Sequence, residues 1–182
     1  MTLMWIDIIS DDCIKIVWAI LVTLLWFFIF RQRKFNRHRH NRMKSKKILQ
    51  KIRSFPFTGQ RITYLRMIDP FVFEELLLDA FKAKGFNVVR NKRYTGDEGI
   101  DGVVWKNGTK YLIQAKRYKG HINVKHVTEF IALVESHKCH GFFCHTGKTG
   151  PKSKQVVQNY GNITILSGQS LIDLISESSL DK

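Results

Sequence analysis

The 182-residue sequence predicts a mixed α/β domain, in which a β-sheet is flanked by helices, preceded by a membrane segment. Three observations support this fold class. Segments with helical and with strand periodicity alternate through the longer, C-terminal part of the chain. An Asn-Gly pair separates two strand-like runs, which is a strong signal for a β-hairpin. An uncharged apolar run near the N-terminus is followed at once by a cluster of bases.

The net charge is unevenly distributed. Lys and Arg number 30 against 15 Asp and Glu, which gives a formal net charge of +15 and points to a polyanionic partner. Residues 31–53 contribute eleven bases and no acid, whereas residues 54–182 carry a net charge of only +6. A hydrophobic content of 44% excludes disorder of the whole chain. The three cysteines are widely spaced, which argues against a disulfide scaffold and favours a reducing compartment.

The apolar run predicts a single transmembrane helix over residues 13–30. Eighteen helical residues span about 27 Å, close to the bilayer core of roughly 30 Å. The bases follow the run, so the positive-inside rule places residues 1–12 outside and the C-terminal domain in the cytoplasm, at the cell inner membrane. A cleaved signal peptide would instead place bases before the run and small residues at its end.

Residues 31–66 form a predicted basic juxtamembrane segment and linker. Their bases suit anionic lipid head groups or, alternatively, nucleic acid, and the position beside the apolar run favours lipid. We therefore expect an anionic bilayer to be a partner of residues 13–53. Residues 42–53 could continue as a helix with Ile48, Leu49 and Ile52 on one side, and residues 54–59 break it.

The remaining domain, residues 67–182, starts with a capped helix. Asp69 is a good N-cap, Pro70 suits the first turn, and Gly85 ends the helix. Strands are expected at 87–90, 102–105 and 111–116, with Asn107-Gly108 as the hairpin loop. Further elements follow in the order helix 124–137, strand 142–145, helix 152–160, strand 163–166 and helix 171–175. The result is an α-β-β-β-α-β-α-β-α order.

The hairpin register brings polar side chains together. With Asn107-Gly108 as the loop, opposed positions sum to 215, so Asp101 faces Gln114 and Lys116 points to the same face. Carboxylate and amide oxygens are ligands for a hard cation such as Mg²⁺. A lysine beside them can offset charge that develops on a phosphate. Glu74 borders the apolar stripe of the first helix and is a candidate third ligand.

Several short motifs occur together over residues 68–175. They are Phe73-Glu74, Lys84-Gly85-Phe86, Thr95-Gly96-Asp97-Glu98-Gly99-Ile100-Asp101, Gln114-Ala115-Lys116-Arg117-Tyr118, and Gly141-Phe142-Phe143 with Thr146-Gly147. In this combination the region resembles the catalytic domain of the Mrr-like restriction endonucleases, within the PD-(D/E)xK nuclease superfamily. Any one piece would be weak, but their order and hairpin spacing are specific.

The resemblance implies a restriction-endonuclease-like fold with an α-β-β-β-α-β core and a divalent-metal-dependent DNA endonuclease, of type IV-like specificity for foreign or modified DNA. The cofactor it implies is Mg²⁺, with Mn²⁺ as an alternative. By resemblance Asp101 binds the metal, Gln114 replaces the usual second acid, Lys116 orients or activates water, and Glu74 helps to hold the metal. Asp97 and Tyr118 are expected to support them. A homodimer on DNA is also implied.

Bases near the site are candidate DNA contacts. They are Arg93, Arg117, Lys119, Lys125 and Lys148, and His145 could also touch the backbone. Zinc is disfavoured, because the Cys139-His140 and Cys144-His145 pairs supply only two thiols and Cys144 lies in a predicted strand. Two other functions stay open: a catalytically inactive, membrane-tethered module that binds DNA or a partner, in which Asp101 and Lys116 form a salt bridge, and a Holliday-junction-type nuclease.

Overall fold

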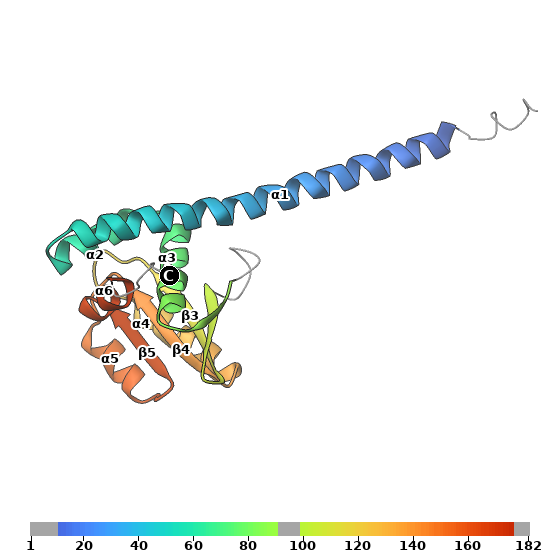
Figure 1. The fold of residues 1–182 in the computed structure, drawn as a ribbon. Coiled ribbons are helices and arrows are strands. Elements are labelled where there is room, and N and C mark those ends of the chain that lie inside the picture. The colour runs from blue at the N-terminus through green and yellow to red at the C-terminus, as the bar shows by residue number, and fades with distance from the viewer. Residues whose placement is uncertain (1–10, 91–98, 177–182) are drawn as a thin grey trace, which may run out of the picture. The chain divides into compact units, whose positions relative to one another are not determined.

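The computed structural model describes residues 11–90 and 99–176, without the side chains of residues 11–13 and 30–38. The chain divides into two compact units between His40 and Asn41. Helix α1 (Asp11–Ser54) contributes to both units. Every other helix and strand of the described residues belongs to the second unit (Figure 1).

In the first unit, α1 exposes its apolar side chains. Those from Ile14 to Ile29 are between 43% and 69% exposed. Among the residues that the structure describes, no helix has the length and apolar character needed to cross a membrane. The predicted transmembrane helix at 13–30 is therefore not supported.

The second unit contains a five-stranded mixed sheet in the order β1-β2-β3-β4-β5. Strands β1 (Asn87–Val89), β2 (Gly102–Lys106) and β3 (Thr109–Lys116) are antiparallel. Strands β4 (His140–His145) and β5 (Ile163–Ser167) continue the sheet parallel to β3. The mixed sheet flanked by helices agrees with the predicted fold class.

The sheet is covered on both faces, and each face has its own apolar cluster. Helices α2 (Thr58–Met67), α3 (Pro70–Ala83) and α6 (Gln169–Ser176) contribute to one cluster. Helix α4 (Val124–Ser136) fills the other, with partly buried side chains of α5 (Pro151–Gln158). Helix α2 was not predicted. It begins after Phe57 without a side-chain cap, so the sequence carries no strong start signal there.

The β2–β3 hairpin has the predicted register. Its pairs run from Gly102–Ile113 to Lys106–Thr109. Asn107 and Gly108 have positive φ values of 50° and 79°, as a two-residue type I′ loop requires. The register therefore places the start of β2, which follows Asp101, beside the part of β3 that contains Gln114.

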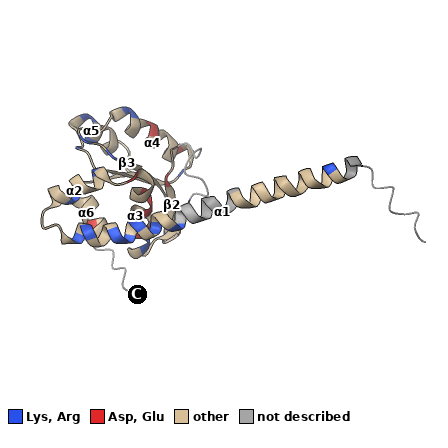
Figure 2. Cartoon of the chain, turned by 90° about the horizontal axis from the view of Figure 1, so that it is seen from above, with Lys and Arg blue, Asp and Glu red and all other residues tan. Residues whose placement is uncertain are grey.

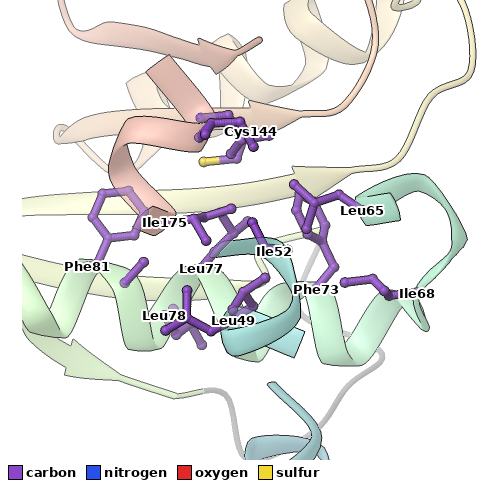
Figure 3. Packing of buried hydrophobic residues seen from close by; sticks show 14 of the residues in the cluster. Leu49, Ile52, Leu65, Ile68, Phe73, Leu77, Leu78, Phe81, Cys144 and Ile175 are labelled. Carbon is purple, nitrogen blue, oxygen red and sulfur yellow. The ribbon is translucent and has the colours of Figure 1, made fainter. Parts of the chain in front are cut away.

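The last turns of α1 belong to the core of the second unit. Leu49 and Ile52, only 2% and 0% exposed, lie in one cluster with Phe73 and Leu77 of α3 (Figure 3). Lys and Arg residues recur along this part of α1 (Figure 2). The compact unit thus begins at Asn41, whereas the sequence suggested a domain start at residue 67. Apolar side chains spaced along the basic run account for the difference.

Candidate active site

Helix α3 holds Glu74 at the border of the core. The Asp69 carboxylate accepts hydrogen bonds from the backbone amides of Phe71 (2.9 Å) and Val72 (3.3 Å), so it caps the helix as predicted. Glu74 is half-buried beside the buried stripe of α3. Burial, followed by the nearby Asp101 carboxylate, raises the pKa of Glu74 to about 8. This pKa marks a carboxyl group whose negative charge is poorly compensated.

Asp101 lies immediately before the first residue of β2 that pairs with β3. Its backbone amide donates to the Ile113 carbonyl (2.8 Å), and its carboxylate accepts from the Ala115 amide (2.6 Å). The predicted register continues only to Gly102, and the Asp101 carboxylate reaches the backbone of β3. Burial raises the pKa of Asp101 to about 6, while the Ala115 amide and Lys116 act in the opposite direction.

Gln114 is buried and held in one orientation. Its side chain is 7% exposed, and its amide nitrogen donates to the Gly99 carbonyl (3.0 Å). Gly99 has φ +86°, and a Cβ there would lie 2.9 Å from that nitrogen, so the position requires glycine. The Gln114 Oε1 atom is buried and has no hydrogen-bond partner among the described residues. An oriented acceptor without a partner is available to a cation.

Lys116 completes the centre at the end of β3. It lowers the pKa values of both Glu74 and Asp101, so its ammonium group interacts with both carboxyl groups. The structure therefore brings Glu74, Asp101 and Lys116 into one electrostatic cluster, with Gln114 two residues before Lys116 on the same strand. Two carboxylates and an amide oxygen suit a hard divalent cation. The described residues contain no cluster of three or more His, Cys, Asp or Glu suited to a metal.

The residues predicted to contact DNA differ in their exposure. Lys119, Lys125 and Lys148 are exposed. Backbone hydrogen bonds between Lys148 and both Gly120 and Ile122 join the loops that carry Lys119 and Lys148. Arg93 and the supporting Asp97 lie outside the described residues.

Two expected DNA contacts instead turn inward. The Arg117 guanidinium donates to the backbone carbonyls of Arg66 (3.2 Å) and Ile68, at the junction between α2 and α3. His145 is 0% exposed, and burial lowers its pKa to about 4, so the ring is neutral near pH 7. Its Nδ1 accepts a hydrogen bond from the Gly147 amide (3.2 Å), so the buried His145 side chain holds the loop that follows β4. The expectation that His145 touches DNA is wrong for this arrangement.

The sequence did not predict the contacts among the residues around the end of β3. Tyr118, predicted as a supporting residue, hydrogen-bonds through its hydroxyl to His126 Nδ1, and its backbone amide donates to Thr146 Oγ1 (3.0 Å). The Thr146 hydroxyl returns a bond to the Tyr118 carbonyl (3.1 Å). These contacts join residues up to 28 positions apart, so only the fold could reveal them.

Comparison with known proteins gives one family. A model of the family Mrr_cat, described as a restriction endonuclease, matches residues 65–175, which is more than half of the chain. A search of curated proteins found no match.

Among solved structures, the chain is similar to the DNA modification-dependent restriction endonuclease AspBHI, with a TM-score of 0.53 and 18% identity over 65% of this chain and 35% of that one. This likeness concerns the fold alone. The restriction endonuclease MspJI in complex with a 27-mer oligonucleotide matches at TM-score 0.46 and 18% identity, over 58% of this chain and 27% of that one. The protein of unknown function AF1548 matches at TM-score 0.45 and 17% identity, over 54% and 58%. The chain thus spans less than two thirds of each of these chains.

Proposed function

Because the chain belongs to the restriction endonuclease family Mrr_cat, we propose that it hydrolyses phosphodiester bonds of DNA with the help of a divalent metal ion. One observation carries the metal dependence. On the strand that also carries Lys116, the buried Gln114 Oε1 atom has no hydrogen-bond partner within residues 11–90 and 99–176, and Glu74 and Asp101 have raised pKa values. A cation among these oxygens would satisfy the amide and offset both carboxylates.

Asp101, Gln114 and Glu74 are the residues proposed to hold the ion, Mg²⁺ or Mn²⁺. Such an ion, when bound, makes a coordinated water more acidic and so supplies a nucleophile near neutral pH. Lys116 offsets negative charge on the phosphate oxygens during attack and can orient the water. The Ala115 amide fixes the Asp101 carboxylate, and the Gly99 carbonyl fixes the Gln114 amide, so the oxygens are positioned in advance.

We propose that Lys119, Lys125 and Lys148 contact DNA phosphates. All three are exposed, and the hydrogen bonds between the two loops hold Lys119 and Lys148 in a common structure. Foreign or modified DNA is the proposed target, cut by a homodimer when both strands are cleaved. The alternatives make different predictions: an inactive module binds DNA without cutting it, and a junction nuclease prefers four-way junctions to linear duplex.

We also propose that residues 13–53 attach the chain to an anionic membrane, at the cell inner membrane with the catalytic domain on the cytoplasmic side. The support is the uncharged sequence of residues 16–30, the exposure of its described apolar side chains and the bases that follow. Flotation of the full chain with vesicles that contain anionic lipid tests this proposal. We expect deletion of residues 1–40 to weaken flotation, because the apolar run is then lost. Failure of the full chain to float would contradict the proposal.

The nuclease proposal is tested with the full chain and plasmid DNA. We expect Mg²⁺ or Mn²⁺ to support nicking or linearisation, and EDTA to abolish it. Lys116→Ala should lose activity, whereas Lys152→Ala, which changes an exposed lysine of α5, should retain it. Metal-independent cutting, or equal activity of wild type and Lys116→Ala, would refute the proposed site. Parallel assays on methylated duplex and on four-way junctions identify the preferred substrate.

A further inference from the structure

Arg117 follows the proposed catalytic Lys116, and its guanidinium is partly buried against backbone carbonyls. Its Nη1 donates to the carbonyls of Arg66 and Ile68, which lie at the C-terminal end of α2. The last carbonyls of a helix have no partner within the helix, and a cation there also complements the helix dipole. Arg117 therefore closes the end of α2 from the end of β3.

Arg66 makes the reciprocal connection. Its Nε and Nη2 atoms donate to the Thr146 carbonyl at 3.0 and 2.7 Å, in a forked arrangement that lysine cannot reproduce. Thr146 is fully buried, and its backbone amide donates to the Lys116 carbonyl (3.2 Å). A closed ring results, in which Lys116 bonds to Thr146, Thr146 to Arg66, and Arg66 to Arg117, the residue covalently bound to Lys116.

This ring of hydrogen bonds connects the start of α3, which carries Glu74, to the end of β3, which carries Lys116. Ile68 immediately precedes Asp69, the N-cap of α3, and Glu74 lies in the first turns of that helix. Arg117 immediately follows Lys116 at the end of β3. The contact between Arg117 and Ile68 therefore fixes where α3 begins relative to β3. An error of about 1 Å in such a position is enough to weaken a catalytic site substantially.

We infer that Arg117 and Arg66 are positioning residues that set the approach of Glu74 to Asp101 and Lys116, rather than residues that contact DNA. The inference rests on the proposed function, because it assigns their effect to the metal-binding geometry. It gives Arg117 a different role from Lys119, which is exposed two residues later in the same loop. The two residues are consequently a matched pair for experiment.

The test uses the full chain and two binding measurements that do not need activity. Mn²⁺ binding is followed by the rise in melting temperature on titration, and DNA binding by fluorescence anisotropy in EDTA at several salt concentrations. We expect Arg117→Ala to raise the half-maximal Mn²⁺ concentration at least tenfold and to leave the DNA dissociation constant within twofold. Lys119→Ala should weaken DNA binding, reduce the salt slope by about 0.9 and leave the Mn²⁺ titration unchanged.

Two further variants distinguish a loss of positioning from misfolding. Arg66→Ala breaks the same ring from α2 and should reproduce the Mn²⁺ defect. Arg117→Lys keeps the positive charge but loses the guanidinium, so it should show an intermediate defect. Circular dichroism melts identify any variant that does not fold, and the remaining variants then decide the question. In the cleavage assay, the folded variants should regain part of their rate at high Mn²⁺ concentration.

The outcomes separate this inference from the proposed function. Weakened DNA binding of Arg117→Ala with an unchanged Mn²⁺ titration would overturn the inference, as would no change in either measurement. A wild type that binds Mn²⁺ but does not cut DNA would refute the nuclease proposal and leave the positioning role standing. A wild type that does not bind Mn²⁺ would refute both.

Discussion

Two neighbouring carboxyl groups on α3, those of Glu74 and Glu75, have very different charged partners. Glu75 is only 2% exposed, yet its carboxylate is 2.9 Å from the Arg90 Nε atom, and the same guanidinium pairs with Asp79. Glu74 is less buried, but it faces Asp101 as well as Lys116, and its pKa rises to about 8. A buried acid with a matched arginine is a structural element, whereas an acid with incomplete compensation is prepared for an added cation.

The comparison also explains why the metal is proposed on one side of α3 only. Asp79 receives a hydrogen bond from Ser45 (3.2 Å) and lies 3.8 Å from the Arg42 Nε atom, so α1 adds to the compensation around Glu75. On the other side, the Gln114 Oε1 atom has no hydrogen-bond partner among the described residues. Burial alone therefore does not distinguish the functional acid. The balance of partners does.

The largest expected effect is on DNA cleavage. Asp101→Asn should reduce the rate at least a hundredfold, because it removes a charged metal ligand while retaining the shape of the side chain. Glu75→Gln is the matched control, and we expect it to remain within tenfold of wild type in single-turnover plasmid cleavage under conditions where both proteins are folded. Equal losses for the two variants would contradict the proposed distinction between the carboxyl groups of the cation site, Asp101 and Glu74, and the arginine-paired carboxyl group of Glu75.

The next effect concerns the folding role of α1. A chain that starts at residue 55 lacks Leu49, Ile52 and the Ser45 contact, whereas one that starts at residue 41 keeps them. Loss of a fully buried leucine or isoleucine side chain typically costs about 2–5 kcal/mol. We expect residues 41–182 to unfold cooperatively on heating and residues 55–182 to lack a cooperative transition. A stable shorter chain would show that this part of α1 is dispensable.

Arg90→Ala tests the compensated side of the comparison. Glu75 and Asp79 would lose their shared guanidinium while remaining largely buried, and breaking such a pair costs about 3 kcal/mol or more. Chemical denaturation should reveal that loss. Combining Arg90→Ala with Glu75→Gln should recover part of it, because the unpaired charge is then removed. Absence of recovery would mean that Arg90 acts through packing instead.

Glu74→Gln should have the opposite, smaller effect on stability. Because the pKa of Glu74 rises from about 4.5 to about 8 on folding, the native state holds more protons across that window, and stability falls as pH rises through it. The variant should therefore be more stable than wild type by about 1 kcal/mol above pH 8, a figure reduced for solvent screening, with the gain vanishing below pH 4.5. Melting curves in EDTA across pH 4–9 measure this. A gain independent of pH would contradict the account.

The sequence predicted the arrangement of the strands at the candidate site, because its signals are local. Asn107-Gly108 determined the hairpin register, which the structure confirms, and the motifs nominated Asp101, Gln114 and Lys116 as site residues, which stays a prediction. The change of pairing at Asp101 could not be predicted, because it depends on which β3 backbone group the carboxylate reaches. The role of Arg117 was likewise hidden, since its carbonyl partners lie about fifty residues away and belong to a helix without a start signal.

The C-terminal part of α1 shows a second limit of prediction from the sequence. Buried positions Asn41, Ser45, Leu49 and Ile52 recur at helical spacing, which is a recognisable signal for a packed face. The surrounding bases led the same residues to be assigned to a segment outside the domain. Charge density describes the solvent face of a helix, whereas domain membership depends on the narrower stripe beneath it.

The central claim is that Glu74, Asp101 and Gln114 form a cation site that supports DNA hydrolysis. The most direct test is plasmid cleavage by the full chain during a Mn²⁺ titration, with wild type and Asp101→Asn measured side by side. The account predicts saturable, metal-dependent cleavage by wild type, and for Asp101→Asn a rate at least a hundredfold lower. Cleavage that is indifferent to metal, or that Asp101→Asn leaves intact, would contradict it.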